Sequence, residues 1–298
     1  MLLQGFTHLK SILMRKSTLR NEETLEMDPL TFLYPFLEII KSGETNGPIT
    51  ATALASIEKC ITYGLVSPTT PNAAAAMAAM TQAVTQCKFE ATEALADEAV
   101  LLRILLVLRT MLEAPVGRLL TDELVCAIME TSFSMSFQPL YSELLRRSAK
   151  QHLVYMVQVV MKRLEEIDPA VDPLPKVAQA SAEKAVQRSR SFSSPSTFVP
   201  HEAGDRRFHP TLEPARPTMT GYGLPAIREL LRVIITLIHP VDTQNTDATR
   251  GLGLSILHMC FEVAGERMAQ FGSIVELITK EGCKHLIQVL ASLQFTMT

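Results

Sequence analysis

The chain has 298 residues, of which 47% are hydrophobic and 20% charged, and its formal net charge is −3. This size and composition allow a well-filled core in one long domain or two ordinary ones. The near-neutral balance gives no bulk basic field of the kind that attracts nucleic acid. The five cysteines are widely spaced and include no C-x-x-C pair, which indicates reduced, cytosolic thiols and neither a disulfide framework nor a zinc site.

No segment approaches the roughly 18 apolar residues that a membrane span needs. The first residues also hold no apolar run long enough for a secretory signal. The sequence therefore predicts at most peripheral association with a membrane.

Apolar residues recur at helical spacing through the first 167 residues, and no alternating strand pattern interrupts them. Asp28 before Pro29 and Thr121 are signals for helix starts, and Gly43 is a signal for a helix end. Pro35 lies inside the second helix, so that helix is kinked or begins later. The expected helices cover about 2–14, 29–41, 48–64, 72–86, 97–112, a segment from 122, and 140–167.

The helix at 97–112 is apolar nearly all round, with Leu101, Ile104, Leu105 and Leu108 among its large side chains. Such a helix is usually covered by neighbours on several sides. Asp97 is the expected N-cap. We therefore expect this helix to be a central core element around which the others pack.

The composition changes at residue 168. From there to about 220 the chain is rich in proline and serine and poor in large aliphatic residues, which predicts a disordered linker. Helical patterns return after residue 221. Their expected ranges are about 225–238, 246–264, 266–280 and 282–293, separated by glycines.

Paired helices with short connections and no fixed repeat length predict an all-α fold, an irregular α-solenoid of the armadillo/HEAT kind. The alternative is a compact all-α bundle with a separate C-terminal helical piece. The predicted division is a helical domain at 1–167, a linker at 168–220 and a second helical domain at 221–298.

Catalytic motifs are absent: the sequence has no phosphate-binding loop, no G-x-S-x-G and no H-E-x-x-H. His152 and His258 fall within expected helices and are interpreted as core or boundary histidines. Cys126 lies on an apolar face and is interpreted as a small hydrophobic residue. Glu165 and Glu166 are interpreted as a solvated helix end. We predict no catalytic residue, cofactor or metal site.

The linker contains one more specific motif, RSRSFSSP at 188–195, which places Ser191 and Ser193 three residues after basic residues. This spacing suits basophilic kinases, and a phosphate at Ser193 would add about −1.5 to −2 charge at pH 7. It also resembles phosphoserine peptides that 14-3-3 proteins bind through arginine clusters. Chance matching in a Ser/Arg-rich linker is the alternative.

Several strings are more specific than the composition. They are TFLYPFLEII (31–40), GPIT (47–50), DEAVL (97–101), VLRT (107–110), PVG (115–117), SELLRRS (142–148) and YGLPAIREL (222–230). In this order they resemble the N-terminal region of the large Golgi exchange factors for Arf GTPases, the Gea/GBF class. Residues 29–167 resemble the dimerisation and cyclophilin-binding domain of that class, and 221–290 resemble the start of its homology-upstream domain.

The resemblance implies armadillo-like arrays that form a homodimer, dock on other parts of the exchange factor and bind small GTPases or Golgi membrane factors. It also implies a cytoplasmic protein, peripheral at Golgi membranes. A lysine and a glutamate implicated in self-association in this class match Lys59 and Glu98. An ordinary surface charge is the alternative for each.

The strings typical of the catalytic exchange domain do not occur in these 298 residues, nor does the later homology-upstream region. On this resemblance the chain is a fragment or a truncated gene product that does not catalyse exchange by itself. Two alternatives come from other classes of protein. One is a generic α-solenoid adaptor, and the other is an enzyme with an unfamiliar all-α site.

Overall fold

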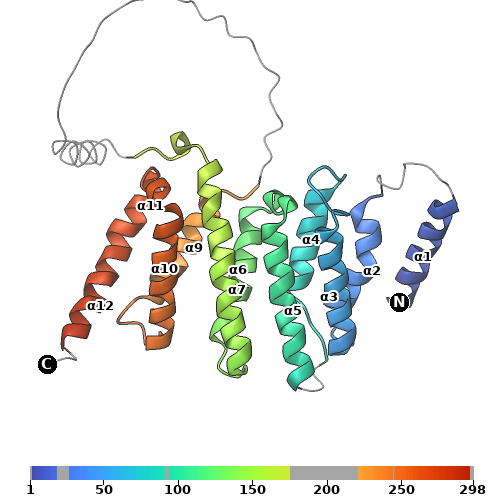
Figure 1. Cartoon of the computed structure of the whole chain (residues 1–298), viewed down its shortest axis with the longest axis horizontal. Helices are drawn as coiled ribbons and strands as arrows, with labels where there is room; N and C mark the ends of the chain where they lie inside the picture. Colours follow the sequence, from blue (N-terminus) through green and yellow to red (C-terminus); the bar gives the residue numbers. More distant parts are fainter. Residues whose placement is uncertain (1, 19–26, 91–93, 175–220, 244, 296–298) are drawn as a thin grey trace, which may run out of the picture.

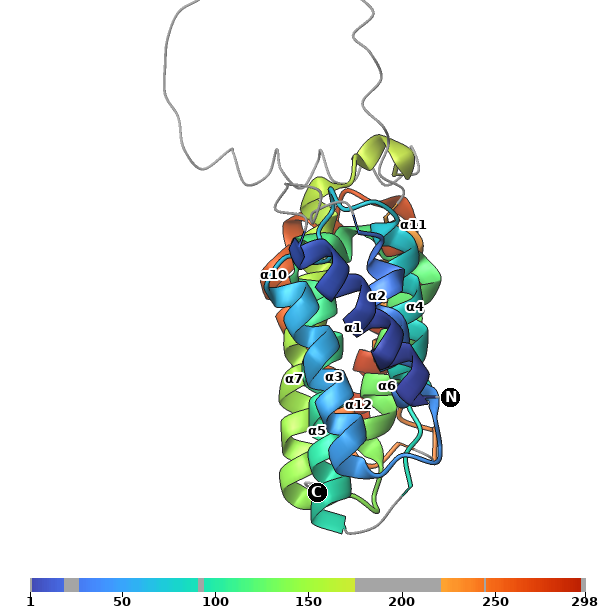
Figure 2. The ribbon, with the colours of Figure 1, turned by 90° about the vertical axis from the view of Figure 1, so that its right-hand side faces the viewer.

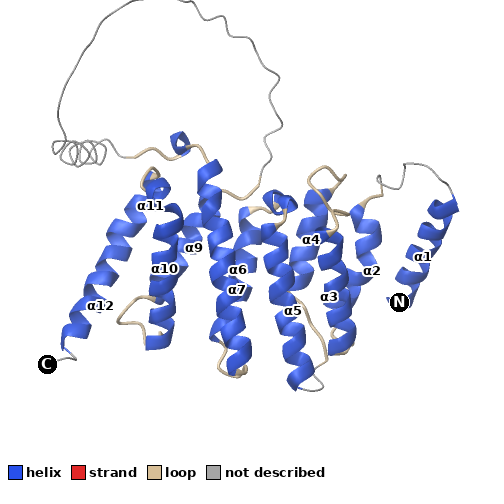
Figure 3. Cartoon of the chain, viewed as in Figure 1, coloured by secondary structure: helices blue, strands red, loops and turns tan. Residues whose placement is uncertain are grey.

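The computed structural model describes residues 2–18, 27–90, 94–174, 221–243 and 245–295. Helices make up the regular structure of these ranges, and none of their residues forms a strand (Figure 3). The α-helices are α1 (Leu2–Thr18), α2 (Pro29–Lys41), α3 (Gly47–Thr62), α4 (Ala73–Thr85), α5 (Ala94–Glu113), α6 (Asp122–Phe137), α7 (Glu143–Lys162), α9 (Leu224–Leu237), α10 (Asp247–Met268), α11 (Gly272–Leu277) and α12 (Cys283–Phe295). Shorter turns are η2 (Pro115–Leu119), η3 (Arg163–Glu166), η4 (Pro169–Val171) and the π turn η5 (Ile278–Gly282).

The helices stack side by side as one two-layered array (Figure 1). In the first layer, α3, α5, α7 and α10 contact one another in that order. In the second layer the order is α2, α4, α6, α9 and α11. Figure 2, which looks along the array, shows the two layers on opposite sides. Because each helix pair packs mainly on its neighbours, the predicted α-solenoid fold is confirmed.

The central helix of the first layer is α5, which contacts α3, α4 and α7. Leu105 and Leu108 are fully buried there, so truncating either to alanine should cost about 2–5 kcal/mol. The prediction of a central core helix is confirmed. The predicted N-cap Asp97 is wrong, because α5 begins at Ala94 and Asp97 lies in its first turn. An acidic side chain in that turn still suits the helix dipole.

Other predicted boundaries also differ from the structure: the long helix predicted to end at 167 ends at Lys162, and the helix predicted at 266–280 is divided among α10, α11 and η5. The long helix predicted to start at 140 begins at Glu143, because Ser142 accepts a hydrogen bond from Leu145 N and caps it. The predicted break at Gly265 does not occur, and α10 continues to Met268. A glycine inside a helix costs only about 1 kcal/mol, which the burial of Ile256, Cys260 and Ala264 in this helix offsets.

The C-terminal helices continue the array. In the second layer α9 packs on α6, and in the first layer α10 packs on α7. The alternative of a bundle with a separate C-terminal piece is therefore contradicted. Within residues 168–174, predicted to be linker, Pro169–Val171 form η4 and Asp172 contacts Ser273 of α11. The rest of the predicted linker, with Ser191 and Ser193, lies outside the described residues.

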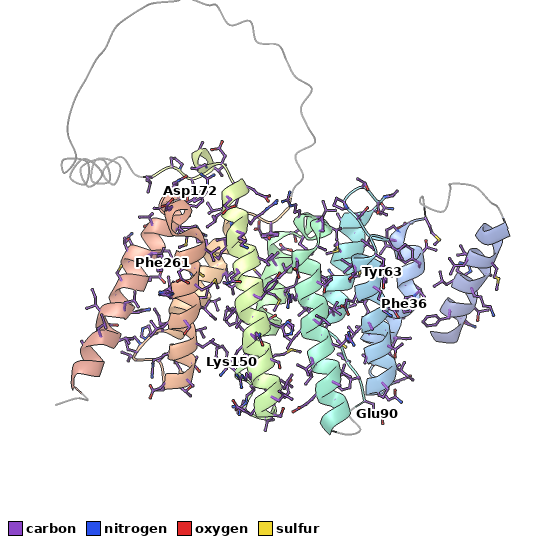
Figure 4. All side chains as sticks on the ribbon, viewed as in Figure 1. Phe36, Tyr63, Glu90, Lys150, Asp172 and Phe261 are labelled. Carbon is purple, nitrogen blue, oxygen red and sulfur yellow. The ribbon has the colours of Figure 1, made fainter. Side chains whose placement is uncertain are left out.

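At the opposite end of the array, α1 packs on α2. The rings of Phe6 and Phe36 meet edge to face with their centroids 5.2 Å apart, and Figure 4 labels Phe36 in this region. Gly5 lies against Pro35, since a Cβ on Gly5 would be 3.2 Å from Pro35 Cβ. One side of α1 is thus held by α2, which leaves its other side at the surface.

Candidate interaction surfaces

Lys59 and Glu98 lie on neighbouring helices of the first layer, α3 and α5. Beside them, an ion pair of 3.1 Å between Arg103 Nη1 and Glu58 Oε2 joins the two helices. The Lys59 side chain is exposed and has no hydrogen-bond or ion-pair partner in the described part of the chain. It is therefore free to pair with a charge on another molecule. The structure brings the two predicted residues to one layer without an ion pair between them.

Glu98, in contrast, is engaged within the chain. Its carboxylate accepts hydrogen bonds from Ser142 N (2.9 Å) and Ser142 Oγ (2.6 Å). Ser142 is also the N-cap of α7. Glu98 therefore ties the start of α5 to the start of α7, 44 residues away. Sequence reasoning missed this structural role, because nothing local in the sequence marks Ser142 as the partner of Glu98.

Further along the first layer, charged and aromatic side chains are also paired within the chain. The Arg109 guanidinium lies 3.8 Å from the centre of the Tyr155 ring, a distance typical of a cation–π contact. Tyr155 Oη donates to Glu113 Oε1 at 2.6 Å, and this hydrogen bond raises the pKa of Tyr155. Arg109 Nε is 3.5 Å from Glu113 Oε2. On this surface of α5 and α7, Arg109, Glu113 and Tyr155 are thus already paired with one another.

The two predicted histidines differ from each other. His152 is half-buried, and its Nδ1 has no hydrogen-bond partner among the described residues. Burial, and then the nearby Arg109 charge, lower the pKa of His152. The core or boundary interpretation is wrong for His258, whose side chain is 73% exposed and 3.5 Å from Glu262.

Where the chain leaves α7, a set of hydrogen bonds attaches it to α10 and α11. Arg267 donates from Nε to Leu164 O (3.0 Å) and from Nη2 to Ile167 O (2.6 Å). Asp172 Oδ2 accepts from Ser273 N (2.8 Å) and Ser273 Oγ (2.7 Å), at the start of α11. Figure 4 shows Asp172 at this edge of the array. We call these contacts the exit contacts.

Where the chain returns at residue 221, a second set attaches it to α6. Tyr222 N donates to Leu120 O at 2.6 Å. Asp122 Oδ1 accepts from Gly223 N (2.8 Å) and Ala226 N (3.0 Å), so a residue of α6 caps α9. Gly221 lies so close that a Cβ there would be 1.9 Å from Arg118 O. We call these contacts the return contacts.

Next to the exit and return contacts, Glu166 pairs with both Arg118 and Arg163. Its distance to Arg118 Nη2 is 2.6 Å. Arg163 also lies over the ring of buried Tyr222, 5.4 Å from its centre. The interpretation of Glu165 and Glu166 as a solvated helix end is therefore incomplete, because Glu166 pairs with two arginines, one of which lies over Tyr222 of the returning chain.

An apolar groove of about 500 Å³ runs between α6 and α9 in the second layer. Glu130 and Glu229 stand among its lining residues. Glu229 pairs with Arg232 of its own helix at 2.8 Å, whereas Glu130 is exposed and unpaired within the described part of the chain. The apolar lining includes Val125, Met129 and Phe133 of α6 and Ala226, Leu230 and Val233 of α9.

Cys126 lines this groove, and the pKa of its thiol depends on the charges nearby. Burial raises the pKa of the Cys126 thiol, and the nearby Glu229, Asp122 and Glu130 carboxylates raise it further. All three charged residues of α6 are acidic. The groove therefore has an apolar lining with the carboxylates of Glu130 and Glu229 beside it.

No group of three or more His, Cys, Asp or Glu side chains is arranged to hold a metal ion in the described ranges. In the same ranges no helix has the length and hydropathy of a membrane span. No protein-family model matches the chain.

Comparison with known proteins gives relatives that span nearly all of this chain. A Schizosaccharomyces pombe protein described as uncharacterised is 31% identical over 98% of this chain and 19% of its own length. The Caenorhabditis elegans homologue of Golgi-specific brefeldin A-resistance guanine nucleotide exchange factor 1 is 28% identical over 97% of this chain. Saccharomyces cerevisiae ARF guanine-nucleotide exchange factor 2 is 24% identical over 97%.

The named relatives are Arf guanine-nucleotide exchange factors. The chain spans about a fifth of the length of these first relatives, from 19% to 22%. The similarity to these relatives thus extends over both halves of the array.

Proposed function

We propose that the chain is a non-catalytic regulatory and scaffolding region of an Arf guanine-nucleotide exchange factor. It would mediate self-association, intramolecular docking and recruitment in Golgi vesicle transport. The main support is that relatives named as Arf exchange factors align with nearly the whole chain over about a fifth of their own length. A two-layered helical array also presents the long surfaces that solenoid proteins use to bind other proteins.

The contact between the two halves of the array supports docking as a mode of action. The exit contacts and the return contacts join helices about 100 residues apart in the sequence. Such a region acts by binding and by shifting conformational populations, with no covalent chemistry of its own. Its partners would be a second copy, the rest of the exchange factor, small GTPases and Golgi membrane factors, with the protein cytoplasmic and peripheral.

A nucleotide-release assay tests the non-catalytic part of the proposal. The 298-residue chain should leave the rate of GDP release from Arf unchanged at every concentration tested. A full-length relative, such as the yeast exchange factor 2, serves as the positive control. Acceleration that increases with the concentration of the chain would contradict the proposal.

Sedimentation equilibrium of the same chain tests self-association through Lys59. We expect a dimer whose dissociation constant rises about fivefold in Lys59→Ala, the effect of removing one exposed ion pair. Lys284→Ala, which removes an exposed lysine of α12, is the matched control and should change nothing. A wild-type chain that stays monomeric at micromolar concentration would remove self-association from the proposal.

A generic α-solenoid adaptor is the second candidate, and the groove between α6 and α9 favours it. Fluorescence microscopy of the tagged chain separates the two candidates. An exchange-factor region should overlap with a Golgi marker, whereas a diffuse distribution would favour an adaptor with another role.

A further inference from the structure

We propose that the groove between α6 and α9 binds α1 of a second copy of this chain. The proposal deepens the self-association proposed above and rests on it. It assigns that association to two surfaces, neither of which contains Lys59 or Glu98.

The first surface is the open side of α1. Lys10 lies three residues before Leu13 and four residues before Met14, so these three side chains share one side of the helix. Leu13 is 49% exposed and Met14 61% exposed. Together with Leu9 these residues line a shallow hollow, with Lys10 among the apolar side chains. Leu13 and Met14 are thus the exposed apolar side chains with which this helix would enter an apolar groove.

The charges of the two surfaces are opposite. Lys10 is exposed and has no hydrogen-bond or ion-pair partner in the described ranges, and α1 contains no acidic residue. Glu130 is likewise exposed and unpaired at the groove, on a helix that contains no basic residue. An ion pair between Lys10 and Glu130 would satisfy both groups while Leu13 and Met14 enter the apolar lining.

The occupant has to come from a second molecule. Within one chain, α1 packs at the end of the array and α2 to α5 lie between it and the groove (Figure 1). Two copies can exchange α1 contacts reciprocally, since each offers one helix and one groove. Reciprocal docking closes as a two-fold dimer, the commonest symmetry of soluble oligomers.

Charge reversal tests the pairing in sedimentation equilibrium of the full chain. Lys10→Glu and Glu130→Lys should each raise the dimer dissociation constant about fivefold or more, because each places like charges opposite each other. The combination of both changes should restore the wild-type constant to within about twofold. Single variants that dimerise as the wild type does, or a combination no better than the singles, would overturn the proposal.

The apolar anchors give a second test. Leu13→Asp should weaken the dimer more than tenfold, because an anchor side chain would carry a charge into the apolar groove. The exposed position of Leu13 means that the array itself should keep its melting temperature. Tyr63→Asp, which changes a 75% exposed side chain next to α3, is the control and should dimerise normally.

A synthetic peptide of residues 2–18 separates this proposal from the one about Lys59. The labelled peptide should bind the wild-type chain saturably, measured by fluorescence anisotropy, and should bind Glu130→Lys at least fivefold more weakly. Binding to Lys59→Ala should be unchanged. The absence of saturable binding to the wild-type chain would refute the groove contact, even if Lys59→Ala weakens the dimer.

Discussion

The outer surface of α5 and α7 and the groove between α6 and α9 differ in how far their polar groups are already paired. On the first surface Arg109, Glu113 and Tyr155 bind one another, and Glu98 binds Ser142. At the groove Glu130 is unpaired within the described part of the chain, beside apolar side chains such as Val233. A partner gains more by covering apolar area and pairing a free charge than by displacing existing hydrogen bonds. A dense charge network is therefore a weaker sign of a binding site than a free charge beside an apolar hollow.

The largest expected effect comes from breaking the return contacts, which hold α9 beside α6 and so form the groove. Gly221→Ala places a methyl group against Arg118 O and should lower the free energy of unfolding by about 3 kcal/mol. Denaturant titration followed by circular dichroism measures this.

The control is Gly251→Ala in α10, where a Cβ would meet nothing within 4 Å. This change should stabilise the chain by up to about 1 kcal/mol, because alanine favours helix more than glycine does. Equal changes in the free energy of unfolding for the two variants would contradict the close approach of Gly221 to Arg118 O.

A smaller effect tests whether Glu98 acts in stability or in association. Glu98→Ala removes two acceptors from Ser142, and Ser142→Ala removes the cap of α7, so each should cost about 1 kcal/mol. Scanning calorimetry measures the melting temperatures, and sedimentation measures association in the same samples.

The two variants separate the roles of Glu98. If Glu98 is only a structural tie, both variants should lower the melting temperature and leave the dissociation constant alone. Weaker association in Glu98→Ala, with normal association in Ser142→Ala, would support the family-derived dimer contact.

Tyr155→Phe removes the hydrogen bond between Tyr155 and Glu113 and should lower the melting temperature by only about 1–2 °C. The hydrogen bond to Glu113 raises the pKa of Tyr155, so the folded state favours the protonated phenol. Its contribution is therefore fully present below pH 10 and is lost as the pH rises through the raised pKa. The difference between wild type and Tyr155→Phe should disappear at strongly alkaline pH, and a difference that grows there would be contrary to this pairing.

The smallest perturbation uses Cys126 as a probe of the groove without any substitution. Because its pKa is raised, Cys126 should be alkylated more slowly than exposed Cys283 near neutral pH and should approach it only in more alkaline solution. Peptide mapping by mass spectrometry follows each thiol. Adding the peptide of residues 2–18 should slow Cys126 further and leave Cys283 unchanged, whereas equal protection of both thiols would speak against a local effect.

The sequence predicts the core of this fold well, because burial on several sides leaves a local pattern. The leucines of 97–112 identify α5 in this way, and residues 28 and 121 mark true helix starts. Gly265 gave a wrong break, because packing along α10 overrides the weak local preference of one glycine. The interaction surfaces are less predictable, since each joins distant residues. The hydrogen bonds of Asp122 to Gly223 and of Asp172 to Ser273 each span 101 residues. The groove is lined by residues of both α6 and α9, so the sequence pattern of one helix alone does not predict it.

The exit and return contacts lie at the predicted boundary between the helical regions 1–167 and 221–298. Helices of both regions belong to the same array and are joined by these hydrogen bonds. The contacts, and not the covalent link from 175 to 220, therefore hold α9–α12 in place. The link supplies a high local concentration, while the interface supplies the geometry. Two polypeptides ending at 174 and starting at 221 should therefore assemble when they are expressed together, as complementing fragments do. Each polypeptide alone would expose the side chains that are buried where α6 packs on α9 and α7 packs on α10.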